Sequence, residues 1–179
     1  MSAHYSNTER YDPSRHDTSS FSCGNELLDR WLTRYAGQNE RRDAARTFIT
    51  TADGHVVCGY YTLLAGQLEH HEATPEARQG LSRHFPIPVA ILARLAIDSS
   101  HQDRGLGAVL LDDALNRVCR AGEQVAIRAI VVHATDQSAA AFYERFGFKA
   151  LSATPRTLMV TLAALRAAGY EHHAPARDG

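Results

Sequence analysis

An apolar run that passes through a polar turn into an amphipathic helix constrains the fold of this chain more than any other segment. Residues 88–97 are almost continuously apolar, which predicts a strand buried on both faces. Asp98 ends this run, and from Arg104 to about Arg120 the leucines, valines and alanines recur with helical spacing. The sequence therefore predicts a strand–loop–helix unit whose helix begins at Gly105 and Gly107.

The start of this helix is suited to bind a phosphate. Backbone amides in the first turn of a helix have no intrahelical acceptor and carry a partial positive charge. Gly105 and Gly107 allow close approach of a ligand, and Arg104 adds a charged donor. Each glycine also disfavours the helix by roughly 1 kcal/mol relative to alanine, which a purely structural helix would avoid. An incidental glycine-rich helix start is the alternative.

Two other phosphate-binding motifs do not match. A dinucleotide-binding fingerprint needs glycine or alanine three residues after Gly107, where the chain has Leu110, and no acidic ribose-binding residue follows. A Walker loop needs Gly-Lys-Ser/Thr, which this segment lacks.

The remaining segments mix strands and helices around the central unit. Asn25 is a candidate N-cap, and Asp53-Gly54 is a hairpin-turn signal between two strands. The predicted elements are an edge strand near 10–16, a helix over 25–37, strands over 46–51 and 55–64, a short helix near 75–83, a strand over 125–133, a helix over 138–146 and a strand over 157–161. This order predicts the α/β (or α+β) class around one sheet.

Length and composition favour one soluble domain. A chain of 179 residues predicts a single domain, assigned to residues 1–169, and a disordered tail is expected over 170–179. The three cysteines are far apart and follow no zinc-binding spacing, so no disulfide or metal site is expected. No apolar stretch reaches the roughly 18–20 residues of a membrane span, and residues 1–5 lack a basic segment followed by an apolar one, so secretion is not expected. We expect a cytoplasmic protein.

The charge pattern leaves two explanations open. A net charge of −1 predicts no affinity for nucleic acid by itself. Of the 19 basic residues only Lys149 is a lysine, and the planar fork of arginine suits phosphate contacts. A GC-rich genome would produce the same arginine bias without any function.

Two motifs together resemble the GNAT superfamily of N-acetyltransferases. Gln102-Asp103-Arg104-Gly105-Leu106-Gly107 matches its Gln/Arg-x-x-Gly-x-Gly/Ala motif, and residues 140–148 (AAFYERFGF) resemble a second hallmark of the family. The resemblance implies a GNAT fold, with one mixed, mostly antiparallel sheet flanked by helices. It also implies an acyl-CoA-dependent enzyme that uses acetyl-CoA and no metal.

The same resemblance assigns roles to individual residues. Tyr143 would be the general acid, because a phenol with a pKa near 10 can protonate a departing thiolate. A core tyrosine packed between phenylalanines is the alternative role. The backbone at Leu95, Ala96 and Ile97 would pair with the pantetheine amides as an added strand does. The remaining cofactor-binding candidates are Gln102, Asp103, Arg104, Gly105, Leu106, Gly107, Ala108, Asp136 and Phe142.

Two positions carry a further alternative. Asp136 stands where many members have asparagine, and we expect it to cap the following helix. His133 could act as a base, but a core histidine with satisfied hydrogen bonds is the expected role. No carboxylate stands out as a general base, so water is expected to suffice.

Nearly the whole chain resembles a subgroup, the GNAT toxins of bacterial type II toxin–antitoxin pairs (the TacT and AtaT kind). The resembling stretches include Phe21-Ser-Cys-Gly-Asn25, residues 59–63 and residues 88–98. This resemblance implies acetyl transfer to the α-amino group of an aminoacyl-tRNA, which blocks translation. It also implies a ribbon–helix–helix antitoxin as partner and a homodimer.

Arginines supply candidate contacts to tRNA phosphates. The spacing of Arg30, Arg34 and Arg41 allows one helical face, although a solvated charged face is an equal alternative. The full candidate set is Arg30, Arg34, Arg41, Arg42, Arg46, Arg78 and Arg94. Two other functions stay open: an acetyltransferase for a small-molecule amine or a protein N-terminus, and a non-enzymatic module that binds acyl-CoA and a partner.

Overall fold

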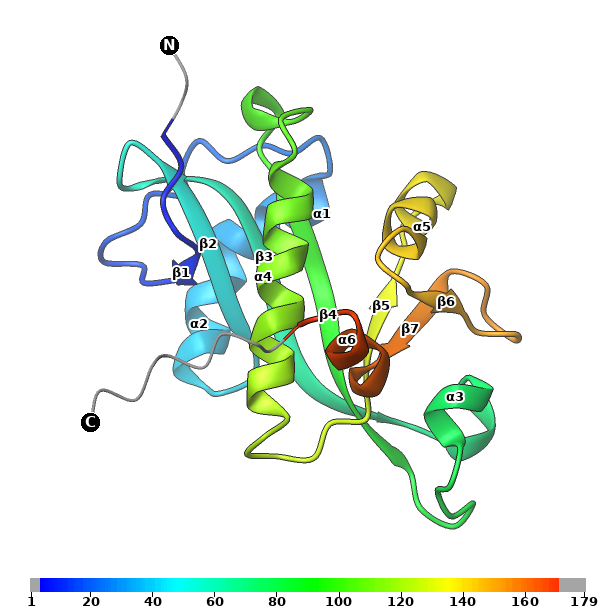
Figure 1. Cartoon of the computed structure of the whole chain (residues 1–179). Coiled ribbons are helices and arrows are strands. Elements are labelled where there is room, and N and C mark those ends of the chain that lie inside the picture. The colour runs from blue at the N-terminus through cyan, green and yellow to red at the C-terminus, as the bar shows by residue number, and fades with distance from the viewer. Residues whose placement is uncertain (1–3, 171–179) are drawn as a thin grey trace, which may run out of the picture. The chain divides into compact units, whose positions relative to one another are not determined.

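Seven strands follow one another by hydrogen bonding in the order β1-β2-β3-β4-β5-β7-β6 in the computed structural model, which describes residues 4–170 (Figure 1). The strands are β1 (Glu9–Arg10), β2 (Arg46–Ala52), β3 (Val56–Leu68), β4 (Ile87–Ile97), β5 (Ala129–His133), β6 (Lys149–Ala150) and β7 (Thr157–Thr161). The helices are α1 (Glu26–Arg30), α2 (Ala36–Arg41), α3 (Pro75–Arg78), α4 (Leu106–Ala121), α5 (Gln137–Glu144) and α6 (Leu162–Ala167). The predicted α/β class, with one mixed sheet flanked by helices, is confirmed.

Contacts divide the described residues into two units. The first comprises the chain up to Leu64 together with Leu92–Ala114, and the second comprises Ala65–Ile91 together with the chain from Leu115 onward. The expectation of one domain over residues 1–169 stays a prediction, and the tail predicted for 170–179 lies, from residue 171 onward, outside the described residues. No helix in residues 4–170 is long and apolar enough to cross a bilayer.

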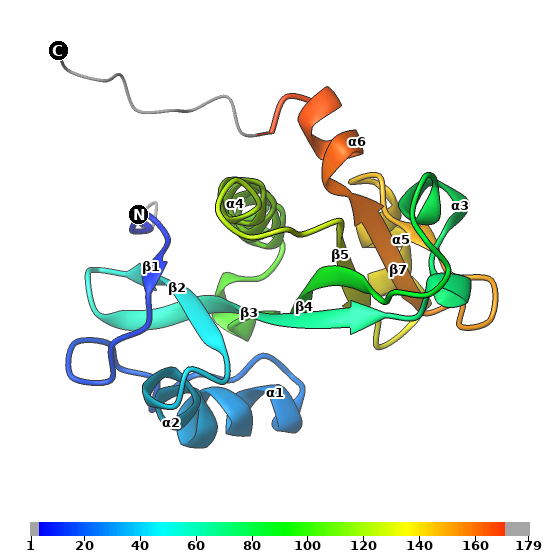
Figure 2. The same cartoon turned by 90° about the horizontal axis from the view of Figure 1, so that it is seen from below.

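The first unit is built on the β2–β3 hairpin. Asp53 (φ 58°) and Gly54 (φ 97°) form its turn in the left-handed region, which confirms the Asp-Gly turn predicted from sequence. Figure 2 shows α1 and α2 on one face of β2 and β3, and the first turns of α4 on the other. On the α1 side, Leu32, Ile49 and Tyr60 form the centre of a core cluster in which each is at most 1% exposed.

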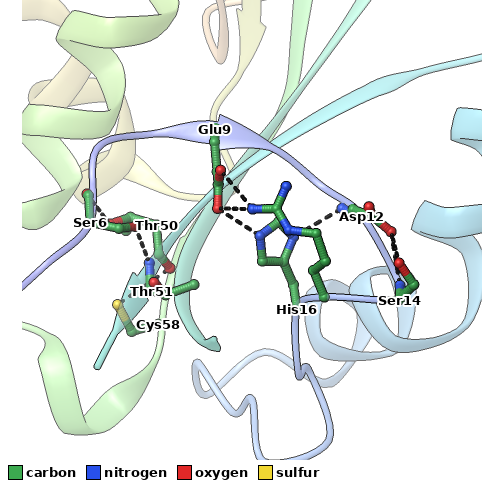
Figure 3. Close-up of polar contacts among 9 residues, drawn as sticks. Ser6, Glu9, Asp12, Ser14, His16, Thr50, Thr51 and Cys58 are labelled. Carbon is green, nitrogen blue, oxygen red and sulfur yellow. Dashed lines mark hydrogen bonds and ion pairs between the residues drawn. The ribbon is translucent and has the colours of Figure 1, made fainter. Parts of the chain in front are cut away.

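The predicted edge strand over 10–16 is wrong beyond Arg10, because Asp12 turns the chain. The Asp12 carbonyl accepts from the amides of Arg15 and His16 at 3.0 Å, and its side chain accepts from the Ser14 amide at 2.9 Å. Figure 3 shows His16 in this turn, with Nε2 2.7 Å from Glu9 Oε1 and Nδ1 accepting from the Asp12 amide at 2.9 Å. The side-chain and backbone bonds of Asp12 favour a turn over a longer ladder.

The helix predicted over 25–37 begins as expected and continues further. Asn25 caps it, since its Oδ1 accepts from the Leu27 amide at 3.0 Å. The chain then makes a wide π-helical turn, η1 (Trp31–Tyr35), before α2 runs on to Arg41. Gly37 does not end the helix and has no positive φ; a Cβ there would lie 2.9 Å from Pro13 Cγ, so Gly37 lets the helix approach Pro13.

The second unit departs from the predictions at its helices. α3 ends at Arg78 rather than near residue 83, because the chain leaves the helix at Gln79 and Gly80 has a φ of 75°. β5 begins at Ala129 rather than 125, and α5 ends at Glu144 rather than 146. The strand predicted over 157–161 is confirmed as β7, which pairs antiparallel with β5 and with β6. α6 was not predicted.

Candidate active site

The loop that joins β4 to α4 is held by Asp98. Its Oδ1 accepts from the Ser100 amide and its Oδ2 from the Ser22 amide, both at 2.9 Å. Burial opposes ionisation of Asp98, but these hydrogen bonds outweigh it and hold the pKa of the carboxyl below its ordinary value. An ionised Asp98 therefore joins the end of β4 to the segment before α1.

Gln102 holds the loop from within. Its Nε2 donates to the Cys23 carbonyl at 3.0 Å and to the Ile97 carbonyl at 2.9 Å. Both N–H groups of the side-chain amide are thereby directed at protein carbonyls. A direct contact from Gln102 to a pyrophosphate stays a prediction, and the geometry shows a role in positioning the loop.

The first turn of α4 has the form of an anion site. Asp103 (φ 61°) and Gly105 (φ 77°) are both left-handed, and the Val109 amide makes a helical bond to the Gly105 carbonyl at 3.2 Å. The amides of residues 106–108 precede that bond, and no hydrogen bond to them is present among the described residues. A Cβ on Gly105 would meet nothing within 4 Å, so the space at the Cβ position of Gly105 is open.

Arg104 lies beside this turn. Its Nη1 is 3.4 Å from the hydroxyl of Tyr5, which in turn is 3.0 Å from Nδ1 of His101. Arg104 is exposed and, within residues 4–170, has no carboxylate partner, so its charge remains available to an anion. The sequence carried no signal for Tyr5, because about a hundred residues separate it from the loop.

Side chains alternate along the end of β4. Ala96 packs into the core cluster on the α1 side, whereas Ile97 packs with Leu106 on the α4 side. Leu95 therefore shares the side of Ile97, and Arg94 shares the side of Ala96. The predicted pairing of the backbone of residues 95–97 with pantetheine stays a prediction.

Tyr143 lies on α5 with its ring buried and its hydroxyl unengaged. The side chain is 8% exposed and makes edge-to-face contacts with Phe142 and Phe148, with ring centroids 5.3 and 5.5 Å away. No described residue forms a hydrogen bond with its hydroxyl. Burial raises the pKa of Tyr143 to about 12, so the phenol keeps its proton at neutral pH. It packs as a core tyrosine does, yet it leaves a proton donor free.

Asp136 and His133 frame the start of α5. The Asp136 side chain accepts from the Ala139 amide at 2.8 Å, which confirms the predicted N-cap. The expectation of a core histidine at position 133 is wrong: His133 is exposed at the last position of β5, and its Nδ1 lies 3.0 Å from Thr157 Oγ1. A strand end that reaches solvent exposes the side chain on its outward face.

The structure brings only some of the candidate arginines together. Arg34, Arg41 and Arg42 line one hollow of about 430 Å³ beside Tyr11 and Pro13. Arg30 is not among the residues that line this hollow.

Three of the other candidate arginines have different surroundings. Arg30 pairs with Glu26 at 2.9 Å, and Arg46 pairs with Asp43 at 2.5 Å and with Glu40 at 3.4 Å. Arg78 lines a separate hollow of about 510 Å³ with Arg83, His70 and His71.

Arg94 has an aromatic partner. Its guanidinium carbon lies 4.0 Å from the centroid of the Trp31 ring. The sequence analysis named Arg94 but not Trp31, because only the tertiary structure brings η1 to β4.

Comparison with known proteins places these features in a family. Residues 43–150 match the family model described as an acetyltransferase (GNAT) domain. The chain is 40% identical, over 151 residues, to the tRNA-acetylating toxin of Mycobacterium tuberculosis (strain ATCC 25618 / H37Rv), which covers 84% of this chain and 89% of that protein.

Solved structures of similar proteins agree with this match. AtaT complexed with acetyl-methionyl-tRNAfMet is 29% identical, with a TM-score of 0.83, over 92% of this chain and 99% of AtaT. A tyrosine-to-phenylalanine mutant of AtaT, bound to the C-terminus of the antitoxin AtaR and acetyl-CoA, is 28% identical, with a TM-score of 0.78, over 93% and 98%. On this sequence match and fold, the chain belongs to the GNAT family of acetyltransferases.

Proposed function

We propose that this protein transfers the acetyl group of acetyl-CoA to the α-amino group of an aminoacyl-tRNA and thereby blocks translation. The observation that carries this proposal is the 40% identity, over 84% of the chain, to a relative named as a tRNA-acetylating toxin. The similarity to AtaT bound to an acetylated aminoacyl-tRNA supports the same acceptor class.

The start of α4 fits the pyrophosphate of acetyl-CoA. The amides of residues 106–108 have no described acceptor, and the space beside Gly105 is open. Arg104 would add a charged donor to the same anion. This loop is supported by Gln102 and Asp98, so it can present its amides without rearranging.

Tyr143 would supply the proton that the reaction needs. The neutral α-amine forms a C–N bond to the acetyl carbonyl carbon, the C–S bond breaks, and the departing thiolate takes the phenolic proton. The amine gives up its extra proton to water. The unengaged hydroxyl of Tyr143 supports this assignment, because it leaves the phenolic proton available to a reacting group.

The hollow beside α2 would take phosphates of the tRNA. Arg34, Arg41 and Arg42 line it, and no carboxylate side chain of the described residues does. Three guanidinium groups in one hollow offer more to a phosphate backbone than the net charge of −1 suggests. Arg46, which is paired with Glu40 and Asp43, would contribute less.

The partners and the cellular location of this protein are inferred from the same relatives. The AtaT structure contains the C-terminus of the antitoxin AtaR, and we infer an antitoxin for this chain, of the ribbon–helix–helix kind. We also infer a homodimer that acts in the cytoplasm, where charged tRNA is found.

Acetylation of charged tRNA tests the proposal directly. Purified protein is incubated with labelled acetyl-CoA and a set of aminoacyl-tRNAs, and label in the tRNA fraction is counted. Tyr143→Phe is expected to lower kcat at least ~100-fold with little change in KM, since general acid catalysis contributes about 10²–10⁴. Tyr35→Phe, on an exposed tyrosine, is the matched control. Turnover of acetyl-CoA on free amines with no charged tRNA labelled would refute the proposal.

A further inference from the structure

Arg94 is a partly buried arginine with no hydrogen-bond acceptor among the described residues. Its guanidinium carbon lies 4.0 Å from the centroid of the Trp31 ring, and this cation–π contact is the interaction that the described residues offer it. Burial lowers the pKa of Arg94, and no carboxylate of residues 4–170 forms an ion pair with it. A guanidinium placed over an indole ring can still donate from its N–H groups to an acceptor.

The ring beneath Arg94 is itself held in place. Trp31 stacks on Tyr60 with an interplanar angle of 9° and 6.1 Å between centroids. Tyr60 is fully buried, its hydroxyl donates to the Leu28 carbonyl at 2.7 Å, and Phe21 contacts its ring edge-on. The ring that Arg94 contacts is therefore itself packed against a buried, hydrogen-bonded tyrosine.

Arg128 is a half-buried arginine whose N–H groups are satisfied by backbone carbonyls, and it serves as a comparison for Arg94. Its Nε donates to the Ala77 carbonyl at 2.8 Å, and its Nη2 donates to the Gln79 carbonyl at 2.9 Å. Arg94 is half-buried, as Arg128 is, but it has no comparable acceptor among the described residues. Because desolvated donors without acceptors are unfavourable, the geometry of Arg94 suits a site that an external acceptor completes.

The place of Arg94 on β4 relates it to the reaction. It directly precedes Leu95, where the pantetheine is expected to pair, and it projects to the α1 side with Ala96. α4 covers the opposite side, where Ile97 packs with Leu106. Arg94 and Trp31 therefore lie together on the side of β4 that faces away from α4. Trp31 also begins a π-helical turn, a feature that often marks functional sites.

We propose that Arg94, presented by Trp31, binds a backbone phosphodiester near the aminoacyl end of the acceptor RNA and so determines which acceptors are used. This inference rests on the proposed function and deepens it. The residue is a specificity determinant, which binds the acceptor without taking part in proton transfer. Its contact is a charge-assisted, bidentate hydrogen bond to a phosphate, which a free amine or a peptide N-terminus does not offer.

The test compares the full-length protein with Arg94→Ala and Arg94→Lys in acetylation of one aminoacyl-tRNA. Arg94→Ala is expected to raise KM for the charged tRNA about 10- to 100-fold, with kcat and the KM for acetyl-CoA unchanged. The slope of log(1/KM) against log[salt] should fall by about 0.7, the value for one phosphate of a single strand. Arg94→Lys keeps the charge but loses the planar fork, so it should keep the slope and recover part of the affinity.

A spectroscopic signal and a charge control accompany the kinetics. Trp31 is the only tryptophan of the chain, so its fluorescence reports on the stack alone. Binding of charged tRNA should change this fluorescence in the wild type and less in Arg94→Ala. Arg120→Ala removes an exposed charge at the end of α4 and should leave KM, salt slope and fluorescence change as in the wild type.

The outcomes separate this inference from the proposed function. If the wild type acetylates charged tRNA and Arg94→Ala has the same KM and salt slope, Arg94 is a packing residue and the inference fails alone. A fall in kcat without a change in KM or slope also overturns it. If the wild type labels no charged tRNA at all, both the proposed function and the phosphate contact of Arg94 are refuted.

Discussion

Replacing Glu40 with alanine is expected to lower the free energy of unfolding by about 2–4 kcal/mol. The Glu40 side chain is 8% exposed and joins α2 to β2. Its Oε2 accepts from Arg10 at 2.8 and 3.0 Å and from Arg46 at 3.4 Å, and its Oε1 accepts from the Thr47 amide at 2.7 Å. One carboxylate thus serves three partners.

Removing the Glu40 carboxylate affects its hydrogen-bond partners to different degrees. Thr47 is fully buried, so its amide would be left without an acceptor, which costs about 1–3 kcal/mol. The side chains of Arg10 and Arg46 are 56% and 37% exposed and can turn to water, so each ion pair contributes about 1 kcal/mol or less. The buried hydrogen bond to Thr47 therefore dominates the loss.

Chemical and thermal unfolding measure the effect. For a chain of this length the loss corresponds to a fall in Tm of roughly 5–15 °C. Glu40→Gln keeps an oxygen for the Thr47 amide and should lose about half as much. Glu26→Ala removes an exposed pair with Arg30 and should change stability by less than about 0.5 kcal/mol. The reasoning is refuted if Glu40→Ala is as mild as Glu26→Ala, or if Glu40→Gln is as severe as Glu40→Ala.

Two further predictions concern the loop and the general acid. Gly105→Ala places a Cβ on a residue with a φ of 77°, which should lower the free energy of unfolding by about 1–2 kcal/mol. It should also raise KM for acetyl-CoA but not KM for the acceptor. An unchanged KM for acetyl-CoA in steady-state kinetics would contradict the anion site. Because burial raises the pKa of Tyr143 to about 12, above the ordinary value near 10, the unfolded chain loses this proton first as pH rises. The stability that Tyr143 contributes is therefore complete below about pH 10 and is lost towards pH 12. When the free energy of unfolding is measured between pH 9 and 12, it should decline less steeply with pH in Tyr143→Phe than in the wild type. Equal slopes in the two proteins would count against the buried phenol.

Most of the fold could be predicted from patterns among residues that are close together in the sequence. The Asp53-Gly54 turn and the Asn25 cap each depend on residues within three positions of one another, and both are confirmed. The strand that ends at Ile97 and the helix that follows Gly105 were also predicted, because continuous burial and helical periodicity are written into neighbouring residues. The loop between them could accordingly be recognised as an anion site from its own residues and their two flanking patterns.

Tertiary structure decided what the polar side chains do. Gln102 donates to Cys23, 79 positions away, and Arg94 lies on Trp31 from another element. Arg34 and Arg41 line one hollow, whereas Arg30, whose spacing in sequence allowed a shared face, does not line it and pairs with Glu26. Periodicity predicts which face of an element is buried, but the partner that satisfies a buried donor or charge depends on how distant segments pack. For that reason the sequence identified the arginines, and only the fold separated those already paired from Arg94, which has no such partner among the described residues.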